Sequence, residues 1–399
     1  MTDIVFAIPG DIELPTGGYV YDRRVLAVLP TFGLVPRHLA LPGSFPSPTA
    51  ADLKTAARLL AKTDPGAPLL IDGLAYGALP ADLIAGLRRR SVALVHHPLC
   101  LETGLPPGRR AALKASEQAA LALAERVVCT SPATARTLIA DFHVPPEKVV
   151  VAEPGTDPAP KASGTLMPMQ LLAVGAVSAR KGFPVLIRAL EPLAGMDWRL
   201  TIAGSLERDA KAVAELKAVV AASGLHDRVR LTGAVVPDTL AAFYDSADIF
   251  VMPSLYEGYG MVLAEAMAHG LAIVCTTGGA AAETVPDDAA IKVAPGDAGA
   301  FSAGLKTLLE NRKLRRRLEA ASWAAGRKLP TWHETARRIF IAITGLGAET
   351  IIGVLPTVAS PIASAKPANG AAAPGKPAGG KGTARGGPPR SGTAKEELP

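Results

Sequence analysis

The chain has 399 residues, 49% of them hydrophobic and 20% charged, so two domains of ordinary size could each bury a core. Three cysteines without metal-type spacing argue against a disulfide framework, and the net charge of +6 is too modest to indicate a nucleic-acid partner. No apolar run reaches the length of a membrane span, and the N-terminal segment MTDIVFAIPGD does not resemble a signal peptide. We therefore expect a cytoplasmic protein.

Strand-like and helix-like segments alternate along most of the chain. Apolar runs typical of buried strands in the first half are residues 4–9, 68–73, 92–97 and 126–131. Those in the second half are residues 170–175, 198–204, 228–233, 248–253 and 272–277. This alternation predicts two parallel sheets with helices on both faces, joined by the Pro- and Gly-rich segment 150–168. The fold class is therefore α/β, with two Rossmann-like domains and a ligand crevice at the carboxyl ends of the strands.

Two histidines end the strand-like run VALVHH. Because neighbouring strand residues point to opposite faces, only one of His96 and His97 should face the crevice. A histidine at the end of a strand is more often structural than catalytic, and the doublet leaves open which one would act.

Two cations, Arg180 and Lys181, follow a predicted strand and precede a helix that begins near Gly182. Cations at a helix N-terminus oppose the helix dipole, and a bound diphosphate would reverse the sign of that interaction. The alternative is two surface cations at a turn.

The most informative stretch is IFVMPSLYEGYGMVLAEAMAHG, residues 249–270. It predicts a strand, a Gly-rich loop and a helix, an arrangement that binds anions through backbone N–H groups. Gly258 and Gly260 allow a ligand to approach the backbone, and Glu257 lies in the loop. Glu265 lies in an apolar part of the helix, where an unpaired charge is costly. Two carboxylates beside a phosphate site suit a nucleotide sugar.

This stretch, followed by Gly278-Gly279 and Glu283, resembles glycosyltransferase family 4. The resemblance spans about residues 1–345, and its specific core is residues 170–285. It implies retaining, nucleotide-sugar-dependent enzymes of the GT-B fold, in which two Rossmann-like domains face each other across a crevice. The expected parts are an acceptor domain (1–160), a donor domain (165–330) and a C-terminal helix (331–350) that crosses back to the first domain.

The resemblance also implies roles for individual residues. Glu257 would contact the donor sugar and Glu265 the ribose, and one histidine of the pair would lie near the reaction centre. We favour His96 over His97, but the doublet leaves the choice open. Lys181 matches the lysine of the family, and Arg180 substitutes for a basic residue whose usual place is taken by Ala176. The expected donor-binding set is Gly17, Gly18, Arg180, Lys181, Gly204, Gly258, Tyr259, Gly260, Met261, Val262 and Glu265. The first two form a glycine pair that could otherwise be only a turn.

The predicted function is retaining transfer of a sugar, typically a hexose, from a nucleotide sugar to an unidentified glycan, lipid or small molecule. No Asp-x-Asp motif stands on a suitable loop, so we expect no metal and no cofactor, the nucleotide sugar being a substrate. Two alternatives stay open: a non-catalytic sugar-nucleotide-binding relative, and a GT-B nucleotide-sugar epimerase.

Two further segments carry weaker predictions. Residues 356–399 are rich in Ala, Gly, Pro and Lys and predict a disordered basic tail. The arginines of 88–90 and 109–110 could form a peripheral contact with an anionic membrane, at its inner face, or could be solvated helix faces.

Overall fold

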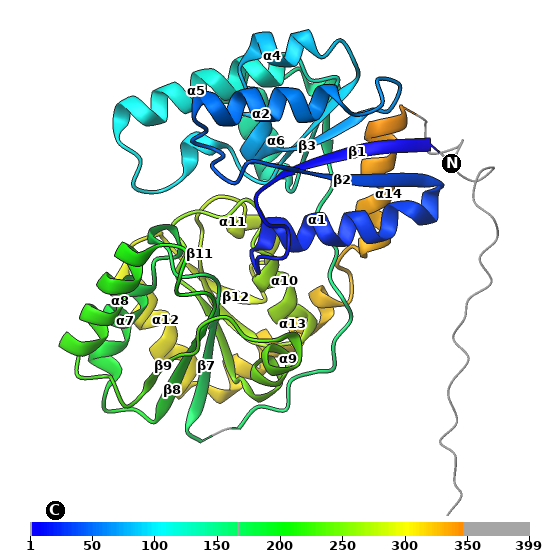
Figure 1. The fold of residues 1–399 in the computed structure, drawn as a ribbon. Helices are drawn as coiled ribbons and strands as arrows, with labels where there is room; N and C mark the ends of the chain where they lie inside the picture. Colours follow the sequence, from blue (N-terminus) through cyan, green and yellow to red (C-terminus); the bar gives the residue numbers. More distant parts are fainter. Residues whose placement is uncertain (1, 166, 346–399) are drawn as a thin grey trace, which may run out of the picture. The chain divides into compact units, whose positions relative to one another are not determined.

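The protein is described here from a computed structural model over residues 2–165 and 167–345. These residues form two six-stranded sheets, with strand orders β2-β1-β3-β4-β5-β6 and β12-β11-β10-β7-β8-β9. All neighbouring strands pair in parallel, and helices cover both faces of each sheet (Figure 1). The predicted α/β class with two Rossmann-like sheets is confirmed.

The described strands and helices have the following bounds. The first sheet contains β1 (Thr2–Pro9), β2 (Leu34–Leu41), β3 (Leu69–Asp72), β4 (Ser91–Val95), β5 (Arg126–Cys129) and β6 (Val149–Val151). The second contains β7 (Met169–Val174), β8 (Trp198–Ala203), β9 (Val229–Leu231), β10 (Ile249–Met252), β11 (Ala272–Thr276) and β12 (Ala290–Val293). The α-helices are α1 (Gly17–Val28), α2 (Ala50–Ala61), α3 (Gly73–Tyr76), α4 (Ala81–Gly86), α5 (Pro107–Ala122), α6 (Pro132–Phe142), α7 (Phe183–Leu190), α8 (Ala210–Ala222), α9 (Pro237–Ser246), α10 (Met261–Ala268), α11 (Ala281–Thr284), α12 (Ala298–Glu310), α13 (Arg312–Gly326) and α14 (Trp332–Thr344). Short 3₁₀ turns are η1 (Leu29–Phe32), η2 (Leu99–Leu101), η3 (Pro146–Lys148), η4 (Ala179–Lys181) and η5 (Glu191–Leu193).

Each sheet is buried on both faces because helices cover both, and alternate side chains of a strand pack against the two helix layers. In β1, Ile4, Phe6 and Ile8 pack with residues of α1 and α14, whereas Val5 and Ala7 pack with residues of α2 to α6. Strand β10 alternates in the same way between α7, α8 and α12 on one face and α9 to α11 on the other. Continuous apolar strands of this kind are typical of parallel sheets.

Three strands that the apolar runs did not predict, β2, β6 and β12, all lie at sheet edges. Strand β2 contains Pro36, which cannot donate a ladder hydrogen bond, and the exposed Arg37. Edge strands are paired on one side only, so they tolerate proline and polar residues that would be costly in a central strand.

The last described helix, α14, packs against the first sheet although it follows the second in sequence. Thr331 caps it with a capping box to Glu334, and Trp332, Ile339 and Phe340 join the apolar cluster under β1 and α1. Figure 1 shows α14, in orange, beside α1. Residues 346–350 of the predicted crossing helix lie outside the described residues, as does the predicted tail at 356–399.

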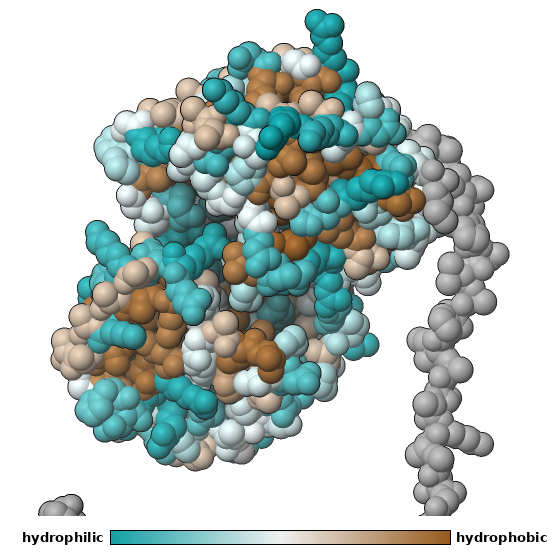
Figure 2. Space-filling view, in the orientation of Figure 1, coloured by the Kyte–Doolittle hydropathy of each residue, from teal (hydrophilic) through white to brown (hydrophobic). Residues whose placement is uncertain are grey.

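Hydrophilic and hydrophobic residues are interspersed on the face drawn in Figure 2. Among the described residues, the large apolar side chains that are exposed come from separate segments: Leu14, Leu123, Met167 and Val236. None of the helices over residues 2–165 and 167–345 is long and apolar enough to cross a bilayer.

Candidate active site

The loop between β10 and α10 approaches the end of β4 so closely that it requires glycine. A Cβ added to Gly258 would lie 2.1 Å from the carbonyl oxygen of His96. The Thr134 hydroxyl donates a hydrogen bond of 3.2 Å to the Gly258 carbonyl, which ties the loop to α6. Gly260, at φ +90°, is the residue before α10. The predicted loop–helix junction is therefore present, and it contacts residues of the first sheet.

Glu257 lies in this loop between two cations. Its Oε1 accepts a hydrogen bond of 2.7 Å from Nζ of Lys181, and its Oε2 lies 3.1 Å from a terminal guanidinium nitrogen of Arg180. Arg180 also donates to the Tyr256 carbonyl at 2.6 Å. The turn η4 places both cations, and the Leu255 N–H donates to the Arg180 carbonyl at 2.8 Å, which joins the turn to the loop. The cations predicted for phosphate and the glutamate predicted for sugar thus form one cluster.

The cluster keeps Glu257 ionised although the side chain is buried. Burial opposes the charged form, but Lys181 and Arg180 outweigh it and lower the pKa of Glu257 to about 2. For Lys181, burial outweighs the attraction of Glu257 and lowers the pKa of its ammonium group. An anionic ligand at the two cations would stabilise their charged forms in the same way as Glu257 does.

A second carboxylate, Glu102, contacts Arg180 from the first sheet's side. It follows η2, and its two oxygens lie 3.5 Å from Nε of Arg180 and 3.5 Å from Nε2 of His97. Burial raises the pKa of Glu102, but His97 and Arg180 outweigh it and lower the pKa to about 2. His97 is therefore the histidine that joins the charged cluster through Glu102.

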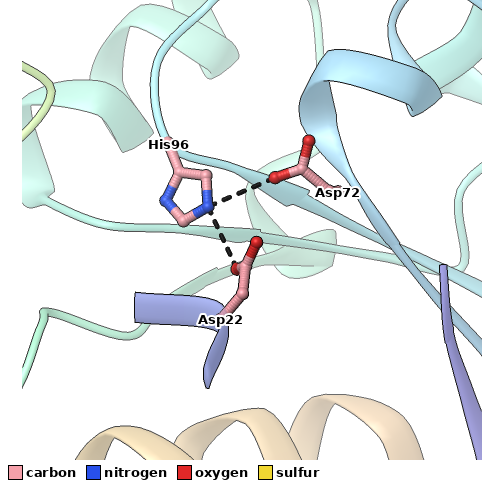
Figure 3. Close-up of side chains that lie close together, drawn as sticks. All are labelled: Asp22, Asp72 and His96. Atoms are coloured by element: carbon pink, nitrogen blue, oxygen red, sulfur yellow. Dashed lines mark hydrogen bonds and ion pairs between the residues drawn. The ribbon is translucent and has the colours of Figure 1, made fainter. Parts of the chain in front are cut away.

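His96 instead joins two buried aspartates, as Figure 3 shows. Its Nε2 lies 3.2 Å from Oδ1 of Asp22, on α1, and 3.3 Å from Oδ2 of Asp72, at the end of β3. These three atoms lie within 4.8 Å of one another, a spacing that one metal ion could bridge. The Asp22 contact is also a hydrogen bond and the Asp72 contact is only 0.1 Å longer, so a proton on Nε2 accounts for the geometry without a further group.

Glu265 lies on α10, as expected, with a partner that the sequence did not suggest. The Tyr244 hydroxyl donates a 2.7 Å hydrogen bond to Oε2 of Glu265, and the Tyr244 ring stacks on His269 at 4.9 Å. Burial raises the pKa of Glu265. This hydrogen bond orients the carboxylate that the family resemblance assigns to the ribose.

The other predicted donor-binding residues surround these clusters. A Cβ added to Gly18 would lie 3.3 Å from the His96 ring, and one added to Gly17 would lie 3.8 Å from the Met261 sulfur. Gly204 contacts Gly175, at the end of β7, so closely that a Cβ there would be 2.0 Å from the Gly175 carbonyl oxygen. The carbonyl of Val262 faces the Tyr244 hydroxyl at 3.5 Å.

Tyr259 lies apart from the charged cluster. It lines a cavity of about 220 Å³ with residues of α6, the inter-sheet segment and α11: Ser131, Pro132, Glu153, Ala280, Glu283 and Thr284. Its carbonyl accepts a hydrogen bond of 2.5 Å from the Thr284 hydroxyl. This hydrogen bond joins the loop after β10 to α11.

A buried carboxyl group, Glu117 on α5, supports the segment that carries Glu102. Its Oε2 accepts the Leu99 N–H at 2.9 Å, and its Oε1 is buried with no hydrogen-bond partner among the described residues. Burial raises the pKa of Glu117 to about 8, more than the Leu99 hydrogen bond lowers it.

Glu117 gives a pH prediction. Because its folded-state pKa of about 8 exceeds the usual 4.5, the folded state binds more protons between these values, and its stability should fall as pH rises through that range. Glu117→Gln should remove this dependence, measured by urea unfolding at several pH values. The exposed Glu215→Gln is the control. Equal pH dependence in wild type and Glu117→Gln would contradict the assignment.

The sequence analysis assigned no role to the two aspartates that contact His96. Asp72 follows an apolar strand at its carboxyl end, and Asp22 lies on the buried face of α1 with Tyr21 and Val25. An acid on an apolar helix face, or at the end of a buried strand, is the signal that could have identified them.

Comparison with known proteins decides the family. A family model described as Glycosyl transferases group 1 matches residues 168–311, and one described as Glycosyltransferase Family 4 matches residues 16–160. The MMP alpha-(1->4)-mannosyltransferase of Mycolicibacterium hassiacum is 30% identical over 292 residues, which are 68% of this chain and 69% of that protein. The chain belongs to glycosyltransferase family 4. It spans about half the length of several other curated relatives that it matches.

Solved structures agree with this family 4 membership at the level of the fold. Sucrose-phosphate synthase from Thermosynechococcus elongatus matches with a TM-score of 0.72 and 20% identity, over 84% of this chain and 97% of that one. Alr3699/HepE of Anabaena, in complex with UDP-glucose, matches with a TM-score of 0.68 and 17% identity, over 86% of this chain and 100% of that one. The fold of this family 4 chain is therefore GT-B, as predicted.

Proposed function

We propose that this family 4 protein transfers a sugar from a nucleotide-sugar donor to an acceptor, with retention of the anomeric configuration. The observation that carries the proposal is the cluster of Glu257, Arg180 and Lys181 at the junction of loop and helix. It combines a carboxylate for sugar hydroxyls with two cations and a helix N-terminus for phosphates. The UDP-glucose complex of the Anabaena protein, which has the same fold, supports a nucleotide-sugar ligand for this chain.

The chemistry that we propose needs charge stabilisation more than a side-chain nucleophile. The bond between the anomeric carbon and the diphosphate breaks, and the acceptor oxygen bonds to the same face of that carbon. The acceptor proton passes to the departing diphosphate. Arg180, Lys181 and the N-terminal end of α10 would stabilise the charge that develops on the leaving group. In this proposal no resident metal or cofactor takes part.

The proposed donor site is tested by thermal-shift and calorimetric titration of UDP, GDP and ADP and of their common sugar conjugates. One nucleotide series should stabilise the wild-type protein, and Lys181→Ala should weaken that binding by at least tenfold because a charge-assisted contact to phosphate is lost. Lys306→Ala, on an exposed face of α12, is the matched control. Equal binding by wild type and Lys181→Ala would contradict the assignment of the phosphate site.

Turnover assays with the same sugar conjugates, with and without acceptors, distinguish the alternatives. A non-catalytic relative would bind a nucleotide sugar without consuming it in the presence of any acceptor, and an epimerase would convert the sugar conjugate with no acceptor added. A peripheral membrane contact is less favoured, because Arg90 pairs with Glu125 and Arg109 bonds Pro46 and Ser47 within the fold.

A further inference from the structure

The His96 ring is held at one nitrogen by two carboxylates from different elements. Asp22 is fully buried, Asp72 is 1% exposed, and one oxygen of each lies 3.2 Å or 3.3 Å from Nε2. The other ring nitrogen, Nδ1, faces away from both carboxylates (Figure 3). An unprotonated Nε2 would direct its lone pair at two carboxylate oxygens, so a proton on Nε2 is the state that fits two ionised carboxylates.

The charged groups around the ring favour a second proton, on Nδ1. Asp22 from α1 and Asp72 from β3 are the carboxylates that face it, and the guanidinium of Arg23 acts on Asp22. The neutral neighbours are the Tyr21 ring, edge-on at 5.1 Å, and the Thr130 hydroxyl, which donates to the His96 carbonyl at 3.0 Å.

The pKa values agree with this geometry. Burial lowers the pKa of the His96 imidazole, but the two carboxylates outweigh it and raise the pKa to about 10. For Asp22, burial raises the pKa to about 6 against the opposing effect of His96. The raised pKa of His96 favours the imidazolium near neutral pH.

We propose that Asp22 and Asp72 are positioning residues that hold His96 as an imidazolium and present its Nδ1–H to the substrate. His96 then donates a hydrogen bond to an oxygen of the bound nucleotide sugar, and it does not accept a proton during transfer. The identity of the bound molecule rests on the proposed function, whereas the state of the ring in the free protein does not. An imidazolium has no free lone pair, so the acceptor proton must leave by another route, such as the diphosphate.

The state of the ring is measured by NMR of the full chain labelled with ¹⁵N-histidine, with no ligand present. His96→Gln identifies the His96 signals. Both ring nitrogens of His96 should keep imidazolium shifts from about pH 6 to pH 9, a range in which an ordinary histidine loses its proton. A neutral His96 ring at pH 7 would overturn the proposal.

Asp72→Asn tests the positioning role without removing the turn that Asp72 caps. Its Oδ1 can still accept the Leu74 N–H, at 2.8 Å in the wild type, while the atom facing His96 loses its charge. His96 should then titrate within the same pH range, and Asp141→Asn, on the exposed end of α6, should leave it unchanged. A His96 ring that stays protonated throughout in Asp72→Asn would contradict the role of Asp72.

Ligand binding tests whether the Nδ1–H of His96 contacts the bound molecule. With UDP, GDP and ADP and their glucose conjugates as probes, the ratio of sugar-conjugate to nucleotide affinity should be constant with pH in the wild type. In Asp72→Asn this ratio should fall by at least threefold as pH rises, because only the sugar conjugate gains from Nδ1–H. An affinity ratio that does not change with pH in Asp72→Asn would contradict the role of His96 as a hydrogen-bond donor to the sugar conjugate. Failure of every nucleotide to bind would instead refute the proposed function.

Removal of metal is the last readout. If a chelator alters the His96 NMR signals, a cation rather than two protons holds the ring, and the proposal is wrong.

Discussion

Glu257→Gln is expected to abolish nucleotide-sugar turnover and to lower the free energy of unfolding by about 3–5 kcal/mol. Glu257 pairs with both Lys181 and Arg180 in a largely buried site, so its loss leaves two cations without their main counter-charge. Urea unfolding and donor consumption measure the two effects separately. Because the pKa of Glu257 falls from the usual 4.5 to about 2 on folding, its stabilisation is present above pH 4.5 and is lost as pH falls to about 2.

Two further variants separate the effect of Glu257 on stability from its effect on turnover. Glu283→Gln removes an exposed carboxylate that pairs with Arg136, and it should change the stability by less than about 1 kcal/mol. The double variant Glu257→Gln, Lys181→Met removes a buried cation together with its partner and should recover part of the lost stability without recovering turnover. Full activity in Glu257→Gln would refute the assigned role of this residue.

Gly258→Ala is the second substitution with a large expected effect. The added methyl group would lie 2.1 Å from the His96 carbonyl oxygen, so the loop after β10 and the end of β4 must separate. We expect a loss of stability of about 1–3 kcal/mol, typical of overpacking, and loss of measurable nucleotide-sugar binding because the loop carries Glu257. Thermal unfolding with and without the nucleotide sugar that stabilises the wild-type protein measures both.

Gly108→Ala is the matched control for this steric argument. Gly108 lies in α5, and an added Cβ meets no atom within 4 Å. Alanine is favoured over glycine within a helix, so this variant should be neutral or slightly stabilising. If Gly258→Ala binds nucleotide sugars as well as Gly108→Ala does, the close contact between loop and β4 is not needed for binding.

The fold was predictable where strands are central. The runs at residues 170–175 and 248–253 lie within 1 residue at each end of β7 and β10, because strands buried on both faces are continuously apolar. Strands β2, β6 and β12 were missed because an edge strand needs no such run. The run 92–97 was too long by two residues, since β4 ends at Val95 and both histidines follow it.

The candidate site was predictable in its residue types but not in its pairings. The spacing around Glu257 indicates a loop and a helix, yet nothing in it shows that Arg180 and Lys181, more than 70 residues earlier, would pair with that carboxylate. The same holds for Tyr244 with Glu265 and for Asp22 with His96. Such pairs depend on the order of strands in a sheet, which local patterns do not encode.

The position of α14 has a consequence for synthesis of the chain. The apolar cluster under β1 and α1 includes Trp332, Ile339 and Phe340. The core on this face of the first sheet is therefore incomplete until α14 is synthesised, roughly 180 residues after β6. At ribosomal rates of about 5–20 residues per second, that interval is on the order of 10–40 s. During this time one face of the first sheet is incompletely covered on the nascent chain, and the second sheet can fold before the first is complete. Completion of the first sheet's core therefore depends on synthesis of α14.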